Sequence, residues 1–113
     1  MVRDFAVPKA GEQAALSRAG IDPDTVVVLL TDEDSIWVQH IKTGDHITVR
    51  FHRALREDAA VPKEREQEAL RRVGIDANTV AVLLSHGDGI RVQHRKSGDI
   101  ITVYFNHSKM KRQ

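Results

Sequence analysis

Hydrophobic and polar positions in the first half of the chain change their period twice, which marks a helix followed by strands. Helix-forming residues follow Pro8, which suits the first turn of a helix because its missing N–H needs no partner there. Gly20 stands where a glycine cap ends a helix. Residues 25–30 are β-branched and apolar, which is typical of a largely buried strand. Alternating residues over 36–52, interrupted by a turn at 42–45, then predict a hairpin.

The same pattern recurs in the second half of the chain at an offset of 54 residues. Residues 6–51 and 60–105 align without a gap, and 29 of the 46 aligned positions are identical. A unit of about 50 residues rarely buries a sufficient core alone, so we expect two tandem αβββ repeats to share one core in a single α+β domain over residues 1–113. The expected boundaries are 6–52 for the first repeat, 53–59 for the linker and 60–106 for the second repeat.

The alternation within each predicted hairpin assigns its residues to two faces. The apolar residues of both strands share one side only if the connecting loop holds an even number of residues, two or four. This register predicts the inward pairs Ile36 with Phe51, Val38 with Val49 and His40 with Ile47. We expect the two sheets to merge or to pack edge to edge around a pseudo-twofold axis, with the helices covering one side.

The outward face of this register pairs an aromatic residue with an arginine in both repeats. Trp37 lies opposite Arg50 in the first repeat, and Arg91 lies opposite Tyr104 in the second. The two residue types have exchanged strands while remaining partners. A cation–π or stacking contact of roughly 0.5–1 kcal/mol would explain this exchange, which therefore supports the register.

Composition excludes several classes of protein. Charged residues make up 29% of the chain and hydrophobic residues 41%, which is ordinary for a folded soluble protein. The absence of cysteine excludes disulfides, thiolate metal sites and a cysteine nucleophile. No apolar run approaches the roughly 18 residues of a membrane-spanning helix, and the N-terminal residues show no signal-peptide core. We therefore expect a cytoplasmic protein without membrane contact.

Charge is unevenly distributed between the repeats, although the net charge of the chain is only +1. Residues 7–52 hold 4 basic and 7 acidic side chains, a net charge of −3, whereas residues 61–106 hold 7 basic and 6 acidic side chains, a net charge of +1. The C-terminal tail adds Lys109, Lys111 and Arg112. The second repeat is therefore the more plausible half to meet an anion, although a normally solvated surface has the same appearance.

Histidine and hydroxyl residues show no signature of catalysis or metal binding. His40 and His94 occupy equivalent positions, but no pair of histidines has the spacing of metal ligands. We expect both side chains to be hydrogen-bonded at the rim of the core. Ser35 is replaced by Gly89 in the second repeat, and no Ser-His-Asp arrangement or phosphate-binding loop is evident. The sequence thus favours a non-enzymatic protein with no cofactor and no metal.

The uncovered sheet face is the best candidate for function, because it combines aromatic, basic and amide side chains. Aromatic residues between basic ones suit base stacking and phosphate contact, and glutamine can read base edges. We expect Trp37 and Tyr104 to stack, and Gln39 and Gln93 to read polar groups. The expected basic contacts are Arg50, Arg91, Arg95, Lys96, Lys109, Lys111 and Arg112.

Other occupants of this face remain open at the level of sequence. Trp, Tyr and Arg also dominate protein interfaces, so the alternative to nucleic acid is a protein partner. An inhibitor, an antitoxin-like partner or a homodimer would each fit, and the net charge near zero and the acidic loop at residues 32–34 favour this alternative. The simplest interpretation is a solvated sheet face stiffened by cross-strand pairs.

The order of elements in each repeat resembles that of HicA-type toxins. The resemblance rests on residues 69–74, 87–94 and 101–103, which read ALRRVG, GDGIRVQH and ITV. It implies a fold like that of double-stranded-RNA-binding domains, with RNA contacted by the sheet and its loops. Aligning the final histidine with His94 puts Gly89 at the family's catalytic histidine, so the resemblance does not extend to ribonuclease activity.

Overall fold

The computed structural model describes residues 7–51 and 60–105, which form an α+β fold with one six-stranded antiparallel sheet. The first half contains α1 (Ala10–Arg18), β1 (Val26–Thr31), β2 (Ser35–His40) and β3 (His46–Arg50). The second half contains α2 (Glu64–Arg72), β4 (Val80–His86), β5 (Gly89–His94) and β6 (Ile100–Tyr104). Short 3-10 turns at Pro23–Thr25 and Ala77–Thr79 lead into β1 and β4.

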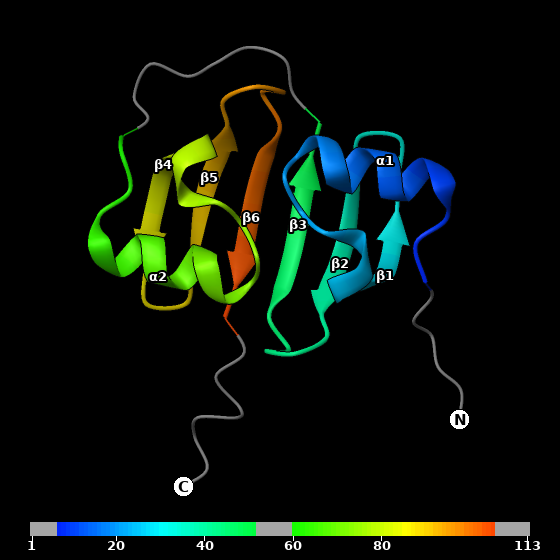
Figure 1. The fold of residues 1–113 in the computed structure, drawn as a ribbon, viewed down its shortest axis with the longest axis horizontal. Coiled ribbons are helices and arrows are strands. Elements are labelled where there is room, and N and C mark those ends of the chain that lie inside the picture. Colours follow the sequence, from blue (N-terminus) through cyan, green and yellow to red (C-terminus); the bar gives the residue numbers. More distant parts are fainter. Residues whose placement is uncertain (1–6, 52–59, 106–113) are drawn as a thin grey trace, which may run out of the picture.

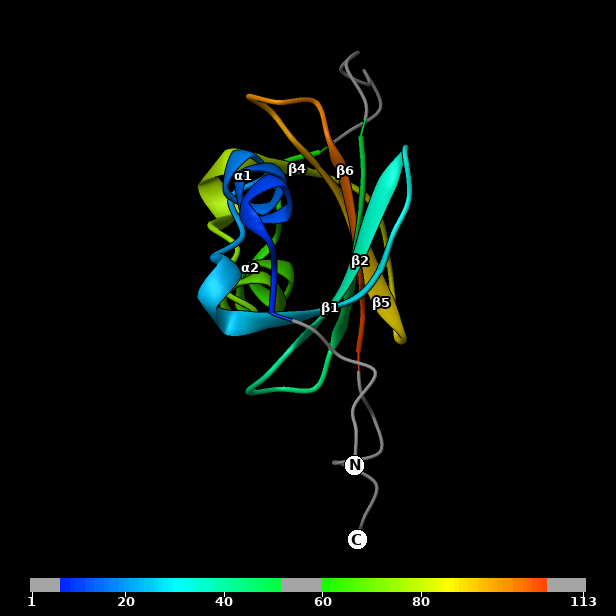
Figure 2. The ribbon, with the colours of Figure 1, turned by 90° about the vertical axis from the view of Figure 1, so that its right-hand side faces the viewer.

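The sheet is continuous through both halves of the chain, with the strand order β1-β2-β3-β6-β5-β4 (Figure 1). The last strands of the two halves, β3 and β6, pair antiparallel at its centre, where Thr48 lies opposite Thr102. Both helices lie on one face of the sheet, and the other face is uncovered (Figure 2). No helix in the described ranges is long and apolar enough to cross a membrane.

The hydrophobic core lies between the helices and the covered face of the sheet. Leu16 of α1 and Leu70 of α2 are fully buried against strand residues such as Val49 and Val103. Because the sheet is continuous, side chains from both halves contribute to one apolar cluster. Neither half therefore has to bury its apolar surface alone, which is the difficulty that small units face.

The helix ends differ in one respect from the prediction. Gly20 and Gly74 have φ angles of 82° and 78°, which confirms the predicted glycine caps because only glycine adopts this region without strain. Pro8 was expected in the first helical turn, but α1 begins after Lys9. The carboxylate of Glu12 accepts a hydrogen bond from the Lys9 backbone N–H at 2.8 Å, so this one bond caps the start of the helix.

The predicted hairpin register is wrong by two residues. Val38 lies opposite Ile47, and Ile36 lies opposite Val49. The turn closes earlier than expected, because the His40 carbonyl accepts a hydrogen bond from the N–H of Gly44 at 2.9 Å. Gly44 has a φ angle of 81°, which suits glycine and permits this closure. A shift of two residues leaves every side chain on its predicted face, so the apolar residues still reach the core.

The corrected register separates the predicted aromatic–arginine pairs. Trp37 lies opposite Thr48, not Arg50, and Arg91 lies opposite Thr102, not Tyr104. A directly paired cation–π contact therefore does not explain why these residue types exchanged strands. Among the described residues, the arginines that lie over aromatic rings are on the helices: Arg18 is 5.6 Å from the centre of the Phe51 ring, and Arg72 is 5.9 Å from that of Phe105.

Two ion pairs connect the helix of each half to the hairpin of the other half. Arg18 Nη2 lies 3.3 Å from Asp99 Oδ2, and Arg72 Nη2 lies 3.1 Å from Asp45 Oδ2. Both carboxylates are buried, while both guanidinium groups are about half exposed. A buried carboxylate needs such a partner because burial removes its hydration. The pairs therefore hold the β2–β3 and β5–β6 turns against the helices.

Candidate functional site

One row of side chains crosses the uncovered face from edge to edge. Each member lies opposite the next across neighbouring strands, and the row runs Leu30, Trp37, Thr48, Thr102, Arg91 and Leu84. Its outer members are apolar and about half exposed, while its centre is polar. None of the six strands, as their bounds are given above, contains an aspartate or a glutamate. The strands therefore present positive and aromatic groups without competing carboxylates.

A hollow of about 480 Å³ lies at the centre of this face. We call it the central hollow, and its lining residues are Ser35, Thr48, Arg50, Arg91, Ile100, Thr102 and Tyr104. Arg50 belongs to β3 and Arg91 to β5, so the two guanidinium groups come from different halves of the chain. Arg91 Nε donates to Thr102 Oγ1 at 3.4 Å, which directs this side chain along the sheet surface. Two cations and several hydroxyl groups thus converge on one concave surface.

The two aromatic residues of this face remain accessible. Trp37 is 38% exposed and Tyr104 is 48% exposed. The Trp37 ring makes an edge contact with the His46 ring at 5.9 Å between centroids and an interplanar angle of 67°. Tyr104 lines the central hollow, whereas Trp37 stands two strands away on β2. Both rings can therefore offer a face to a planar ligand.

The two glutamines that were expected to contact a ligand form hydrogen bonds to the hairpin turns. Gln39 Nε2 donates to the Gly44 carbonyl at 3.0 Å, and Gln93 Nε2 donates to the Gly98 carbonyl at 2.9 Å. Gln93 is only 1% exposed, so the prediction that it contacts a ligand does not agree with the structure. The reason is the turn geometry, because the glycine carbonyls face these amides and give them a local acceptor. Gln39 is partly exposed.

The remaining predicted basic contacts do not line the central hollow. Arg95 and Lys96 are exposed in the β5–β6 turn, which bends toward the helix side of the sheet (Figure 2). Asp99 at the end of this turn forms the ion pair with Arg18, which holds the turn there. Lys109, Lys111 and Arg112 lie outside the described residues. The structure therefore brings together Arg50, Arg91 and Tyr104 from the predicted set.

His40 and His94 lie at the rim of the core, as predicted, and both are buried. His40 Nδ1 lies 3.3 Å from the Thr43 backbone N and 3.2 Å from its hydroxyl. His94 Nδ1 makes the equivalent contacts with Ser97 at 3.3 and 3.1 Å. Burial lowers the pKa of both imidazoles below the ordinary value of 6.5, although Asp45 and Asp99 act in the opposite direction. Both side chains therefore act as neutral acceptors that close the turns.

This lowered pKa predicts a loss of stability at mildly acidic pH. Above about pH 6.5 the histidines are neutral in both states. Below about pH 6.5 both imidazoles take up protons in the unfolded chain but stay neutral in the folded protein. The free energy of unfolding therefore falls until the pH passes the lower pKa of the folded state. Urea denaturation between about pH 8 and about pH 5 measures this loss. The double variant H40Q/H94Q is expected to flatten the dependence; an unchanged slope would show that other groups cause it.

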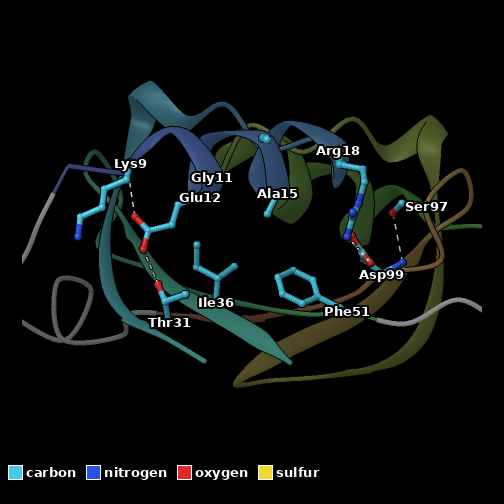
Figure 3. A pocket seen from close by; sticks show the side chains of 11 residues that line it. Lys9, Gly11, Glu12, Ala15, Arg18, Thr31, Ile36, Phe51, Ser97 and Asp99 are labelled. Atoms are coloured by element: carbon cyan, nitrogen blue, oxygen red, sulfur yellow. Dashed lines mark hydrogen bonds and ion pairs between the residues drawn. The ribbon is translucent and has the colours of Figure 1, made fainter. Parts of the chain in front are cut away.

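A further cavity lies on the helix side of the sheet and was not predicted from the sequence. This α1 groove, of about 890 Å³, is lined by Lys9, Gly11, Glu12, Ala14, Ala15, Arg18, Thr31, Ile36, Phe51, Ser97 and Asp99 (Figure 3). A smaller hollow of about 500 Å³ lies at the equivalent place beside α2. One feature of the sequence could have indicated this groove: α1 carries Gly11 where α2 carries Arg65 at the aligned position.

Comparisons with known proteins indicate no function for the uncovered sheet face or for the α1 groove. No protein-family model, no curated protein and no solved structure matches this chain. The resemblance to HicA-type toxins therefore stays a prediction. Within the part of the chain that the structure describes, no group of three or more His, Asp and Glu residues is placed to hold a metal ion.

Proposed function

We propose that this chain is a small, non-enzymatic binding protein that contacts nucleic acid through the uncovered sheet face. The observation that carries the proposal is the central hollow, where Arg50 and Arg91 converge with threonine hydroxyls and Tyr104. Phosphate groups are recognised by charge-assisted hydrogen bonds from arginine and by hydroxyl donors. A backbone phosphate placed in the hollow would receive both kinds of contact.

The aromatic residues extend this mode of binding along the sheet. Tyr104 lies beside the proposed phosphate position, and Trp37 lies two strands away. Stacking of a base on such a ring contributes roughly 1–3 kcal/mol per base and tolerates any sequence. Single-stranded nucleic acid, whose bases are free to stack, therefore fits this face better than a duplex.

We also infer that two repeats related by a pseudo-twofold axis build this face. The support is the pairing of Thr48 with Thr102, which are equivalent positions of the two halves, and the reciprocal pattern of the ion pairs of Arg18 and Arg72. The axis would pass through the central hollow. Divergence at the positions of Arg50 and Arg91 then gives the hollow a cation from each half. The cytoplasmic location expected from the absence of cysteine belongs to the same proposal.

Titration with fluorescently labelled oligonucleotides tests the proposal. Anisotropy measured with single-stranded and double-stranded probes is expected to show tighter binding of the single strand. Affinity for the single strand is expected to fall about sevenfold between about 50 mM and about 200 mM salt, because two phosphate contacts on a single strand give a slope of about −1.4 in log affinity against log salt. The proposal fails if neither probe binds at the lower salt concentration, where phosphate contacts are strongest.

A protein partner is the second candidate. The exposed apolar residues at both ends of the row that crosses the uncovered face favour it. Leu30 and Leu84 are about half exposed at opposite edges of the sheet, on the same face as Trp37. Exposed apolar and aromatic residues on one face are typical of protein interfaces. Light scattering over a concentration series distinguishes the candidates: a dimer that dissociates in a W37A variant would favour self-association through this face.

A further inference from the structure

The α1 groove is a second concave site, separate from the uncovered face because it lies on the helix side of the sheet. Its volume of about 890 Å³ falls within the range of roughly 300–1,000 Å³ that is common for small-molecule sites. α1 borders its length, and β1, β2, the residue after β3 and the β5–β6 turn supply the remaining walls. The groove therefore depends on side chains from both halves of the chain.

The floor of the groove is apolar. Figure 3 shows the side chains of Ala15, Ile36 and Phe51 directed into the same space below α1. Ile36 is almost fully buried, and Phe51 packs against the core while remaining partly accessible. Such a surface gains free energy when a hydrocarbon covers it, at roughly 25 cal/mol for each Å² removed from water.

The charged groups at the two ends of the groove are not equally available to a ligand. The Glu12 carboxylate already accepts hydrogen bonds from the Lys9 N–H at 2.8 Å and from the Thr31 hydroxyl at 2.6 Å, and the first of these chiefly lowers its pKa. Asp99 is buried and ion-paired. Arg18 is half exposed and uses only Nη2 to bind Asp99, so its other N–H groups have no hydrogen-bond partner among the described residues. The available donors are therefore cationic.

We propose that the α1 groove binds an elongated amphipathic anion, such as a medium-chain carboxylate. Its hydrocarbon chain would lie on Ile36 and Phe51, and its carboxylate would meet the free N–H groups of Arg18. The nine residues of α1 span about 13 Å, which is comparable to the length of an extended medium-length acyl chain. The guanidinium of arginine suits a carboxylate because its planar donors match the two oxygens.

The two halves of the chain differ at the residues that keep this groove open. Gly11 lines the groove, and the equivalent residue of α2 is Arg65, which lines the smaller hollow. No atom lies within 4 Å of the place where a Cβ of Gly11 would stand, and Gly11 is not among the described glycines with positive φ. Packing therefore does not require glycine here, although glycine weakens a helix by roughly 1 kcal/mol relative to alanine. A larger side chain at this position would narrow the groove.

NMR titration of the ¹⁵N-labelled full chain with decanoate tests the proposal. Saturable shift changes are expected at the amides of Gly11, Ala15, Ile36 and Phe51. The variant G11R introduces the side chain that α2 already carries, so it is expected to fold while weakening decanoate binding at least about tenfold. The matched control G87R makes the same change at an exposed glycine beside the α2 hollow and is expected to bind normally.

Ligands of other charge distinguish the chemistry of the site. Decanol and decylamine are expected to bind at least about tenfold more weakly than decanoate, because neither offers an anion to Arg18. Equal binding of decanol would overturn the assignment of an anionic ligand. Equal binding of decanoate by G11R and by the unmodified chain, or shifts confined to the uncovered face, would overturn the site. These outcomes do not depend on oligonucleotide binding, which uses the other face.

Discussion

Reversing the charge of both arginines in the central hollow, R50E/R91E, is expected to lower affinity for a single-stranded oligonucleotide by about a hundredfold or more at low salt. The two guanidinium groups line one hollow. The described strands carry no acidic side chain, no lysine and no further arginine. In the proposed mode of binding, each substitution removes one phosphate contact and adds a repulsive charge. The slope of log affinity against log salt is expected to become shallower by about 1.4, because two phosphate contacts to a single strand are lost.

A matched variant separates this local effect from the effect of net charge. R65E/R71E changes the net charge by the same amount, but its residues are exposed on α2, on the opposite side of the sheet. When the two variants are compared at about 0.1 M salt, its affinity is expected to fall far less, because charges beyond about 10 Å are largely screened there. Equal losses in the two variants would show that binding responds to total charge, and the central hollow would no longer be the site. Circular dichroism verifies that both variants are folded.

Replacing Gly89 by alanine is expected to lower the free energy of unfolding by about 3 kcal/mol. A Cβ at this position would clash with the backbone carbonyl oxygen of Val103 on the neighbouring strand β6. Val103 is fully buried and Gly89 is paired within the sheet, so the clash is relieved only by moving strand backbone. Such overpacking typically costs 1–3 kcal/mol, a large part of the 5–15 kcal/mol that stabilises a typical domain. Thermal unfolding and urea denaturation measure the loss.

Two further variants place this result in context. G87A is the control, because no atom lies within 4 Å of a Cβ built at Gly87. It is expected to change stability by no more than about 0.5 kcal/mol. G89S transfers the residue of the first half, Ser35, to the second half and is expected to destabilise as G89A does. If G89S were as stable as the unmodified chain, the strands would have to adjust more freely than their burial suggests.

The comparison of Ser35 with Gly89 illustrates how far an internal repeat can be interpreted. Exchange between the two copies suggests that a position tolerates either residue. The structure restricts that tolerance at Gly89, because an added Cβ would clash with the Val103 carbonyl oxygen of the neighbouring strand. Equivalent positions of two similar units can thus differ in the substitutions they accept.

The order of helix and strands, the two faces of each hairpin and the glycine caps could be predicted from the sequence. Each depends on interactions within about ten residues. Gly20 and Gly74 end their helices through local backbone geometry, and the period of two along 36–52 assigns faces without reference to the rest of the chain. The α+β class follows from these local elements.

The register of the hairpin was only partly predictable. Alternation limited the loop to an even number of residues, but it could not distinguish registers that differ by two. The choice was made by hydrogen bonds within the turn, from the Gly44 N–H to the His40 carbonyl and from the Gln39 side chain to the Gly44 carbonyl. The Gln93 side chain makes the equivalent bond to the Gly98 carbonyl and is buried, so its assignment to the exposed surface was wrong.

By itself the sequence determined which residues are apolar, which faces they share and that the same residue pattern recurs at an offset of 54 residues. Only the tertiary structure decided that β3 and β6 join the halves into one sheet, and that Arg50 and Arg91 therefore meet in one hollow. It also decided that Arg18 of the first half pairs with Asp99 of the second half. The groove beside α1 is lined by residues of both halves and likewise depends on the tertiary structure. The physical reason is that local periodicity sets the direction of each side chain, whereas contacts between residues far apart in the chain depend on how the units pack.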